Sequence, residues 1–397
     1  MRALLTTALA TLLACRASAP SPSPRAAPLP EAATELGFDT TALAAVRAYL
    51  RAEVDSGSFP GAVVAVGRHG RLAFLAAVGH HGTDDPRPVD TATIYDLASL
   101  TKVIGLTTAV LLLVDAGTLQ LDDLVQRHVP AFRGPGKDSV TIRHLLTHSS
   151  GLPPWRPLYT EATTRAAALR LADTTLLVAP PGTTMAYSDL GAIVLTQVVE
   201  TVAHERLDAY LRARVFGPLG MAHTRFLPPD NWRDRIAPTE RSQDGTTIRG
   251  TVHDENAWRL GGVSGHAGLF STAGDLARFA SWMLAVRAGQ LRDATGVPAP
   301  APALVREFTQ RQGIPAGSTR ALGWDTPSDS GYSSAGSRLS RQSFGHTGFT
   351  GTSIWMDPER DLFVILLTNR VNPTRENTRI LGVRPRVADL VAAALVR

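Results

Sequence analysis

Residues 99–117 read Ser-Leu-Thr-Lys-Val-Ile-Gly-Leu-Thr-Thr-Ala-Val-Leu-Leu-Leu-Val-Asp-Ala-Gly. This apolar run predicts a helix that begins at Ser99 and ends at Ala116-Gly117. A spacing of three residues puts Lys102 on the same helix face as Ser99. The free N–H groups at a helix start favour an alkoxide or an oxyanion. Ser99 is therefore a candidate nucleophile and Lys102 its candidate base.

Lysine is rare in this chain. It occurs only at Lys102 and Lys137, and the remaining basic residues are arginines. Arginine does not deprotonate in proteins, whereas a desolvated lysine can act as a base. That role requires the pKa of Lys102 to be lowered, at a cost of about 4 kcal/mol. Taken alone, the motif is weak, and an ordinary surface lysine is the more frequent reason for such a tetrapeptide.

A second motif, Tyr187-Ser188-Asp189, lies in a predicted turn before a helix that begins near Leu190. A tyrosine at such a point can pass a proton between a nucleophile and a leaving group. A core tyrosine with a satisfied hydroxyl is the alternative.

A third motif, His346-Thr347-Gly348, lies at the end of a predicted strand. Glycine there allows a substrate backbone to approach closely. An exposed strand at this point could bind a peptide-like ligand by adding it to the sheet edge. An ordinary glycine-rich strand end is the alternative.

Around these motifs, the pattern predicts an α/β (α+β) fold. Its antiparallel sheet comes from both ends of the chain, is flanked by helices and carries a mostly helical insertion. The predicted strands are 61–67, 71–78, 342–349, 352–356 and 362–368, the flanking helices are 38–54 and 380–396, and the insertion is 99–289.

In this order and at these separations, the three motifs resemble those of the penicillin-recognising serine hydrolases, whose pattern is S-x-x-K, Y-x-N and then K-T-G or H-T-G. That family includes class C β-lactamases, D,D-carboxypeptidases and related esterases. Residues 145–152 and 265–272 are similar to further family phrases, and the resemblance covers residues 40–396. It implies a serine β-lactamase/transpeptidase-like fold.

The resemblance also implies roles for the motif residues. Ser99 is acylated, Lys102 and Tyr187 move protons, and the backbone N–H groups of Ser99 and Phe349 form an oxyanion hole. The residues implied to line the substrate strand are His346, Thr347 and Gly348. No cofactor is implied, and the substrate is a small ester, a D-Ala-type peptide amide or a β-lactam.

The chain departs from the family pattern at Asp189, which stands where asparagine is usual. Asparagine can donate to a substrate carbonyl, but an ionised aspartate only accepts. Asp189 near Lys102 also favours the charged lysine. There is no E-x-x-L-N segment of the kind that supplies the deacylating glutamate in class A β-lactamases, so hydrolysis of β-lactams by that route is not expected.

The first residues predict an exported lipoprotein. Residues 1–15 form a signal segment that ends in Leu-Leu-Ala-Cys, which is similar to a lipobox, and Cys15 is the expected lipidation site. Residues 16–35 form an Ala/Pro/Ser-rich linker, and residues 36–397 form the hydrolase domain. We expect a membrane-anchored monomer that faces the periplasm or the cell exterior.

The distribution of charged residues and histidines argues against nucleic-acid binding and metal binding. Basic residues are scattered, so the net charge of +5 does not indicate a nucleic-acid partner. His144 and His148 are four residues apart but have no evident third ligand, so no metal site is predicted. Residues 253–255 predict a solvated loop, with an acid/base cluster as the alternative and a substrate-lining role left open.

Three functions remain in view. The first is a serine hydrolase that turns over through an acyl-enzyme. The second is a slowly acylating penicillin-binding or sensing protein with little turnover, and the third is a class C-like β-lactamase.

Overall fold

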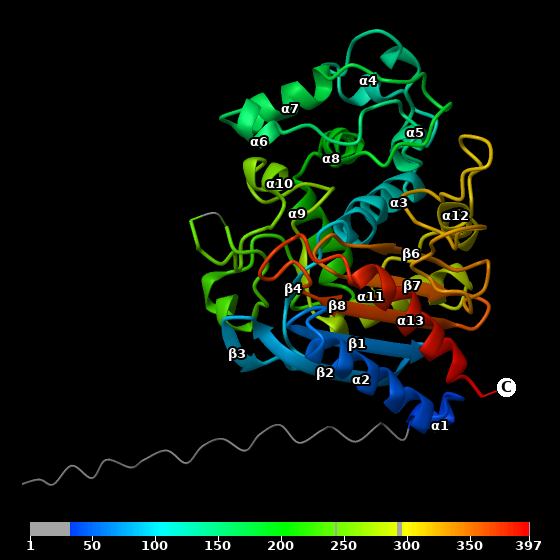
Figure 1. Cartoon of the computed structure of the whole chain (residues 1–397). Helices are drawn as coiled ribbons and strands as arrows, with labels where there is room; N and C mark the ends of the chain where they lie inside the picture. The colour runs from blue at the N-terminus through cyan, green and yellow to red at the C-terminus, as the bar shows by residue number, and fades with distance from the viewer. Residues whose placement is uncertain (1–31, 243, 292–295, 397) are drawn as a thin grey trace, which may run out of the picture.

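The computed structural model describes residues 32–242, 244–291 and 296–396 (Figure 1). Its centre is an antiparallel sheet of six strands in the order β3-β2-β1-β8-β7-β6. Because β1 pairs directly with β8, the two ends of the domain build one sheet, and this prediction is confirmed. The strands are β1 (Gly61–Arg68), β2 (Arg71–Gly82), β3 (Asp85–Pro88), β6 (Phe344–Thr347), β7 (Ser353–Asp357) and β8 (Leu362–Thr368).

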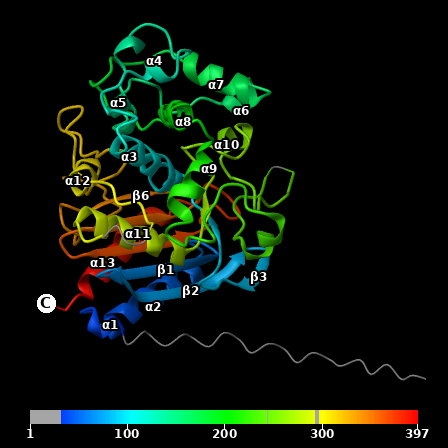
Figure 2. The same ribbon diagram turned by 180° about the vertical axis from the view of Figure 1, so that it is seen from behind.

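Strand β1 is buried on both faces, which explains why its sequence is apolar throughout. Ala62, Val64 and Val66 face one hydrophobic layer, while Val63 and Ala65 face the other. Successive strand residues point to opposite faces, so a continuous apolar run fits a strand covered on both sides. The first face is covered by α1 (Ala32–Glu35), α2 (Thr40–Asp55) and α13 (Ile380–Ala393), and the second by α11 (Ala273–Arg287) (Figures 1 and 2).

The part of the helical insertion that runs from α4 to α8 (residues 125–203) lies on the side of the molecule away from α1, with α3 between it and the sheet (Figures 1 and 2). Its centre is α8, which is buried along most of its length and packs against α3, α4, α5 and α7. The remaining elements, in chain order, are β4 (Tyr95–Asp96), η1 (Lys102–Thr107), α3 (Thr108–Asp115), α4 (Val125–His128), η2 (Lys137–Ser139), α5 (Ile142–Leu146), α6 (Leu158–Glu161), α7 (Arg165–Thr174), α8 (Asp189–Ala203), α9 (Leu207–Leu211), η3 (Arg212–Phe216), η4 (Asp230–Arg235), α10 (Glu255–Arg259), β5 (Phe270–Ser271) and α12 (Pro302–Thr309).

The helix predicted to begin at Ser99 starts in an irregular form. Its residues Lys102–Thr107 form a π-helical segment, and regular α-helix begins only at Thr108. The Thr108 hydroxyl donates to the Val103 carbonyl, five residues back, at 2.9 Å. Gly105 packs closely, since a Cβ there would lie 3.2 Å from a Leu211 methyl. Such wide turns are frequent at functional sites.

At the N-terminus, the predicted signal segment with Cys15 and residues 16–31 of the predicted linker lie outside the described residues. The last four linker residues form α1, in which Ala33 is fully buried. The folded part therefore begins before position 36. Among the helices that the structure describes, none has the length and apolar character needed to span a bilayer.

Candidate active site

Ser99 follows a residue in an uncommon backbone conformation. Ala98 has a φ of 46°, and its N–H donates to Asp96 Oδ1 at 2.8 Å. Asp96 is itself buried at the end of β4, which pairs with β5. A left-handed alanine costs about 1 kcal/mol or more and persists only where its surroundings hold it. The short β4–β5 sheet thus fixes the turn that presents Ser99.

Lys102 is buried and has three acceptors around its amine. Its Nζ lies 3.1 Å from Ser99 Oγ, 3.0 Å from the His266 carbonyl and 2.6 Å from Asp189 Oδ1. Ser99 and His266 accept hydrogen bonds from the amine, and the Asp189 carboxylate forms an ion pair with it. This is the geometry of a charged lysine.

The pKa of Lys102 agrees with that geometry. Burial alone favours the neutral amine, but the adjacent Asp189 carboxylate and the Tyr187 hydroxyl raise the pKa above its ordinary value. The base role predicted from the sequence requires the opposite shift. In the resting structure Lys102 therefore holds a proton that it must release before it can accept the proton of Ser99.

Tyr187 lies over the same lysine. Lys102 Nζ is 4.9 Å from the centre of the tyrosine ring. Burial raises the pKa of the phenol, and the charge of Lys102 partly opposes this effect. The hydroxyl lies close to Ser99 and Lys102, yet it makes no well-aligned hydrogen bond within the described residues. It is therefore free to accept or donate when a ligand enters.

His148 holds the Tyr187 segment in place. Its Nδ1 accepts the N–H of Ser188 at 3.0 Å, and its ring lies 4.5 Å from that of Tyr187. Burial lowers the pKa of His148 well below its ordinary value, so the imidazole is neutral. Ser188 then caps α8 through its side chain, with Asp189 as the first helical residue. The turn before a helix predicted for this motif is confirmed.

His346 is on β6, at the edge of the sheet. Its Nδ1 lies 2.8 Å from the Thr347 carbonyl, and burial lowers its pKa to about 4. Gly345 exchanges two backbone hydrogen bonds with Asp325, which covers this edge at that point. Alternate residues of an edge strand direct their backbone N–H and C=O groups to the same side. Those of Thr347, two residues after Gly345, therefore face this edge as well. Thr347 and Ser99 line one cavity at this edge.

Gly348 is required by packing within the protein. A Cβ at this position would overlap Thr352 Oγ1 and the Leu97 carbonyl. Gly348 also lines a cavity beside Ser99, so the close approach of a substrate backbone to it stays a prediction. The close contact brings the end of β6 against the segment that leads to Ser99.

Two cavities meet at Ser99, of about 340 Å³ and about 260 Å³. Ser99, Tyr187 and Phe349 line both of them. The larger cavity is also lined by Thr347, Gly348, Arg370, Thr378, Ile380, Leu381 and Arg384. The smaller one is also lined by Ala98, Trp155, Asp189, His253, Asp254, Glu255, Ala267 and Arg375. The residues of all three sequence motifs therefore meet at one place.

Residues 253–255 do not form the solvated loop that the sequence favoured. His253 is buried and lies 3.0 Å from Glu240, while Asp254 accepts the Ala257 N–H and begins α10. The Asp254 carboxylate also lies 2.8 Å from His266 Nε2. The solvated-loop interpretation was wrong for His253, which is buried, while Asp254 and Glu255 are partly exposed and are held by ion pairs. All three residues line the smaller cavity, and this is the position that the sequence left open for them.

Sequence reasoning assigned no role to His266 or to the arginines around the site. The His266 carbonyl accepts from Lys102, and its ring lies between Ser264 and Asp254. Arg370 and Arg384 line the larger cavity. The phrase containing His266 was noted for its resemblance, but nothing in the local pattern marked the arginines, which are abundant throughout the chain.

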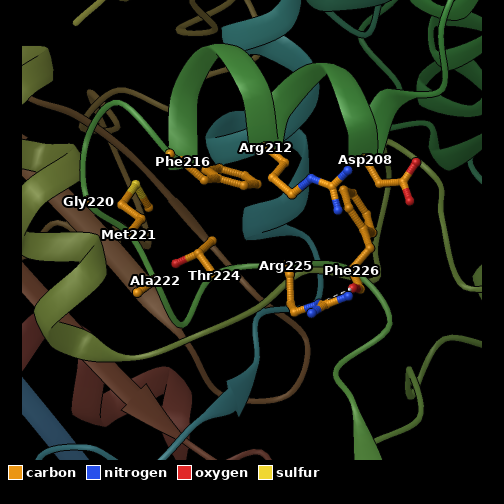
Figure 3. Close-up of a pocket in the computed structure, with 10 residues that line it drawn as sticks. Asp208, Arg212, Phe216, Gly220, Met221, Ala222, Thr224, Arg225 and Phe226 are labelled. Carbon is orange, nitrogen blue, oxygen red and sulfur yellow. Dashed lines mark hydrogen bonds between the residues drawn. The ribbon is translucent and has the colours of Figure 1, made fainter.

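A further cavity of about 280 Å³ lies elsewhere, between η3 and the segment that leads into Phe226 (Figure 3). Its polar side chains include Arg212, Arg225 and Asp208. None of the motif residues lines it, and it holds no serine, lysine or histidine. The nucleophilic chemistry therefore belongs to the cavities at Ser99.

Comparisons with known proteins agree with this arrangement. The family model described as Beta-lactamase matches residues 46–385. A protein from Salmonella schwarzengrund named "Putative D-alanyl-D-alanine carboxypeptidase" is 31% identical and covers 87% of each chain. A protein of the same name from Salmonella typhi is also 31% identical, with 87% of each chain covered.

Solved structures share the fold. One is "EstCE1, a hydrolase with promiscuous acyltransferase activity", with a TM-score of 0.71, 24% identity and coverage of 89% of this chain and 99% of that one. Another is a class C β-lactamase from Rhodobacter sphaeroides, with a TM-score of 0.67, 20% identity and coverage of 88% and 99%. Together with the family match and the relatives at 31% identity, these findings establish that the chain belongs to the β-lactamase family and is a serine hydrolase.

Proposed function

We propose that this hydrolase cleaves D-Ala-type peptide amides and related small esters through an acyl-enzyme on Ser99, releasing a leaving group that carries a carboxylate. The observation that supports this substrate class is the pair of arginines beside the nucleophile. Arg370 and Arg384 line the larger cavity, and no carboxylate lines it with them. The names of the relatives at 31% identity point to the same class.

Both arginines are anchored by backbone carbonyls. Arg384 donates to the Gly348 and Thr352 carbonyls at 2.6 and 3.0 Å, and Arg370 donates to the Phe349 carbonyl at 2.8 Å. Neither forms an ion pair with a carboxylate in the part of the chain that the structure describes. Burial lowers the pKa of Arg384 to about 10, so it remains charged at neutral pH. The cavity thus holds positive charge that a C-terminal carboxylate would balance.

In the proposed mechanism, Ser99 Oγ attacks the scissile carbonyl, and Lys102 and Tyr187 are the groups in reach to take its proton. The backbone N–H groups of Ser99 and Phe349 stabilise the oxyanion. Lys102 or Tyr187 then protonates the leaving amine or alcohol, which departs through the arginine-lined cavity. Water cleaves the acyl-enzyme and regenerates Ser99.

The experiment is a substrate panel with a labelling control. A D-Ala-D-Ala peptide, p-nitrophenyl esters and a chromogenic cephalosporin are compared by kcat/KM. A fluorophosphonate should label Ser99 in the native protein and leave Ser99→Ala unlabelled. Turnover of the peptide supports the proposal. Labelling of Ser99→Ala equal to that of the native protein would reject the nucleophile assignment.

A second candidate is a slowly acylating penicillin-binding or sensing protein. The contact of 2.6 Å between Lys102 Nζ and Asp189 Oδ1 favours it, because it keeps the lysine charged. Burst kinetics separate the two functions. One equivalent of product without further turnover supports the sensing protein, and steady turnover supports the hydrolase.

A further inference from the structure

The smaller cavity differs in charge from the larger one. Three carboxylates line it, those of Asp189, Asp254 and Glu255, together with the single cationic side chain of Arg375. The larger cavity has two arginines and no carboxylate. The nucleophile therefore lies between an acidic pocket and a basic one.

Each of these carboxylates uses one oxygen for a contact inside the protein. Asp189 Oδ1 faces Lys102 at 2.6 Å, Asp254 Oδ1 faces His266 Nε2 at 2.8 Å, and Glu255 Oε1 faces Arg375 at 2.7 Å. Within the described residues, the other oxygen of each carboxylate has no hydrogen-bond partner. Three acceptor atoms without a hydrogen-bond partner therefore belong to side chains that line this one cavity.

The chemistry of the other walls indicates which ligand these acceptors suit. The Tyr187 hydroxyl is buried and lacks an aligned partner in the described part of the chain. Trp155 also lines the cavity and is 48% exposed, so its ring can lie against a cation or an aliphatic stem. No three acidic, histidine or cysteine side chains among the described residues converge closely enough to hold a metal ion. Carboxylate oxygens that come from different sides of the cavity suit an organic ammonium group better than a metal ion.

We infer that the acidic pocket binds an ammonium group carried on the acyl part of the substrate, with Asp189 and Glu255 as its contacts. This inference rests on the proposed function, in which the carboxylate of the leaving group occupies the arginine-lined cavity. The ammonium then lies on the opposite side of the scissile bond. The substrate class is a short peptide or ester with a positive charge before the bond and a negative charge after it.

The same arrangement gives a reason for aspartate at position 189. A substrate ammonium near Asp189 competes with Lys102 for that carboxylate and repels the charge on the lysine. A like charge nearby favours release of the lysine proton, which passes to solvent water. The neutral amine can then accept the proton of Ser99. A cationic substrate therefore accelerates acylation as well as binding tightly.

The test uses two esters that differ only in the proposed contact. p-Nitrophenyl 6-aminohexanoate carries an ammonium where p-nitrophenyl heptanoate carries a methyl group. The amino ester should have a kcat/KM about tenfold or more above that of the heptanoate, as expected for charge-assisted hydrogen bonds. A rise in the acylation rate constant, in addition to a lower KM, is expected from the effect on Lys102.

Three variants locate the effect. Asp189→Asn and Glu255→Gln should each bring the ratio of the two kcat/KM values toward one. Asp208→Asn removes an acidic group from the remote cavity of Figure 3 and should leave the ratio unchanged. Equal rates for the two esters in the native protein, or a preference that survives both site variants, would overturn the inference.

A D-Ala-D-Ala peptide with a free or an acetylated amine on its acyl part separates this inference from the proposed function. If both peptides are cleaved equally and the esters show no preference, the function stands and the inference fails. If neither peptide is cleaved while the amino ester is preferred through Asp189, the inference stands and the peptidase proposal fails.

Discussion

The contact of 2.6 Å between Asp189 Oδ1 and Lys102 Nζ sets the protonation of the site at rest. A general base works only in its deprotonated form, and the carboxylate raises the pKa of the lysine. The fraction of neutral amine at pH 7 is therefore small, and it grows as the pH rises. Acylation of the native protein by a neutral ester should keep increasing into the alkaline range.

Asp189→Asn should shift that alkaline limb to lower pH. Asparagine removes the charge that stabilises the ammonium, so the pKa of Lys102 falls and more amine is neutral at pH 7. The amide also restores a donor for a substrate carbonyl, so acylation by a cephalosporin should rise relative to a simple ester. The measurement is the acylation rate from pH 5 to pH 10. An unchanged pH profile together with an unchanged substrate ratio would show that Asp189 has no such effect.

His346 makes the fold sensitive to acid. Its pKa is about 4 in the folded protein, compared with about 6.5 in an unfolded chain. Between these values the unfolded state binds more protons, so the free energy of unfolding falls as the pH drops through that window. The free energy of unfolding, measured with urea, should fall less between pH 7 and pH 5 for His346→Gln than for the native protein.

The control for that measurement is His80→Gln, since His80 is exposed on the surface. This variant should retain the acid dependence of the native protein. His148, which is also buried and neutral, accounts for part of the remaining slope. If the free energy of unfolding depends on pH in the same way for His346→Gln and the native protein, the prediction is wrong.

At the residue level, the candidates Ser99, Lys102, Tyr187 and Asp189 came from short motifs in which reactive residue types stand at a fixed spacing. The sequence located the departure at Asp189 as well, since that prediction needs only the identity of one residue. The Arg384 contact with the Gly348 carbonyl was not predictable, because it joins α13 to the residue that follows β6, 36 positions earlier in the chain. A contact between distant elements has no local pattern.

Among the elements, the turn between β6 and β7 holds the nucleophile segment. Thr350 Oγ1 donates to the Asp96 carbonyl at 2.7 Å, and Thr352 Oγ1 donates to the Leu97 carbonyl at 3.0 Å. Both carbonyls precede Ser99 by two or three residues. The edge of the sheet and the nucleophile are therefore fixed relative to one another through this turn.

Gly348→Ala should disturb that link. The new methyl overlaps Thr352 Oγ1 and the Leu97 carbonyl, so the turn must move away from Ser99. A displacement of about 1 Å at a reacting group can cost about 10²-fold in rate. We expect a loss of that size in the acylation rate, measured with a p-nitrophenyl ester, while circular dichroism shows a folded protein.

Gly382→Ala on α13 is the matched control. No heavy atom lies within 4 Å of a Cβ at that position, and alanine favours a helix over glycine by about 1 kcal/mol. This variant should keep the native acylation rate and be slightly more stable. Native activity in Gly348→Ala would show that the turn does not position Ser99.

The sequence predicted the regular elements well and the irregular ones poorly. Strands β1 and β2 and helix α2 follow clear periods of apolar residues, and their observed bounds lie within a few residues of the predicted ones. The π-helical start at Lys102 was not predicted, because it depends on a hydroxyl that bonds five residues back and on tight packing at Gly105. The contacts of His253 with Glu240 and of Asp254 with His266 were likewise not predicted, because each joins two residues that are more than ten positions apart.

For the whole molecule, we expect Cys15 to anchor the described domain to a membrane. The apolar segment that ends in Leu-Leu-Ala-Cys motivates this prediction. Cys15→Ser should abolish labelling with a fatty-acid analogue and move the protein from the membrane fraction to the soluble one. Esterase rates should not change, since every residue of the candidate site lies within the domain. Labelling that persists in Cys15→Ser would exclude this attachment site.

The pairing of β1 with β8 has a consequence for how the chain reaches its native state. Ala65 lies opposite Ile365, so the middle of the sheet joins segments from near the beginning and the end of the polypeptide. During synthesis, β1 and β2 emerge early but leave one edge unpaired until the last strands follow. High contact order of this kind slows folding and exposes an apolar edge meanwhile. A nascent chain of this protein should therefore depend on a chaperone until translation has passed Thr368.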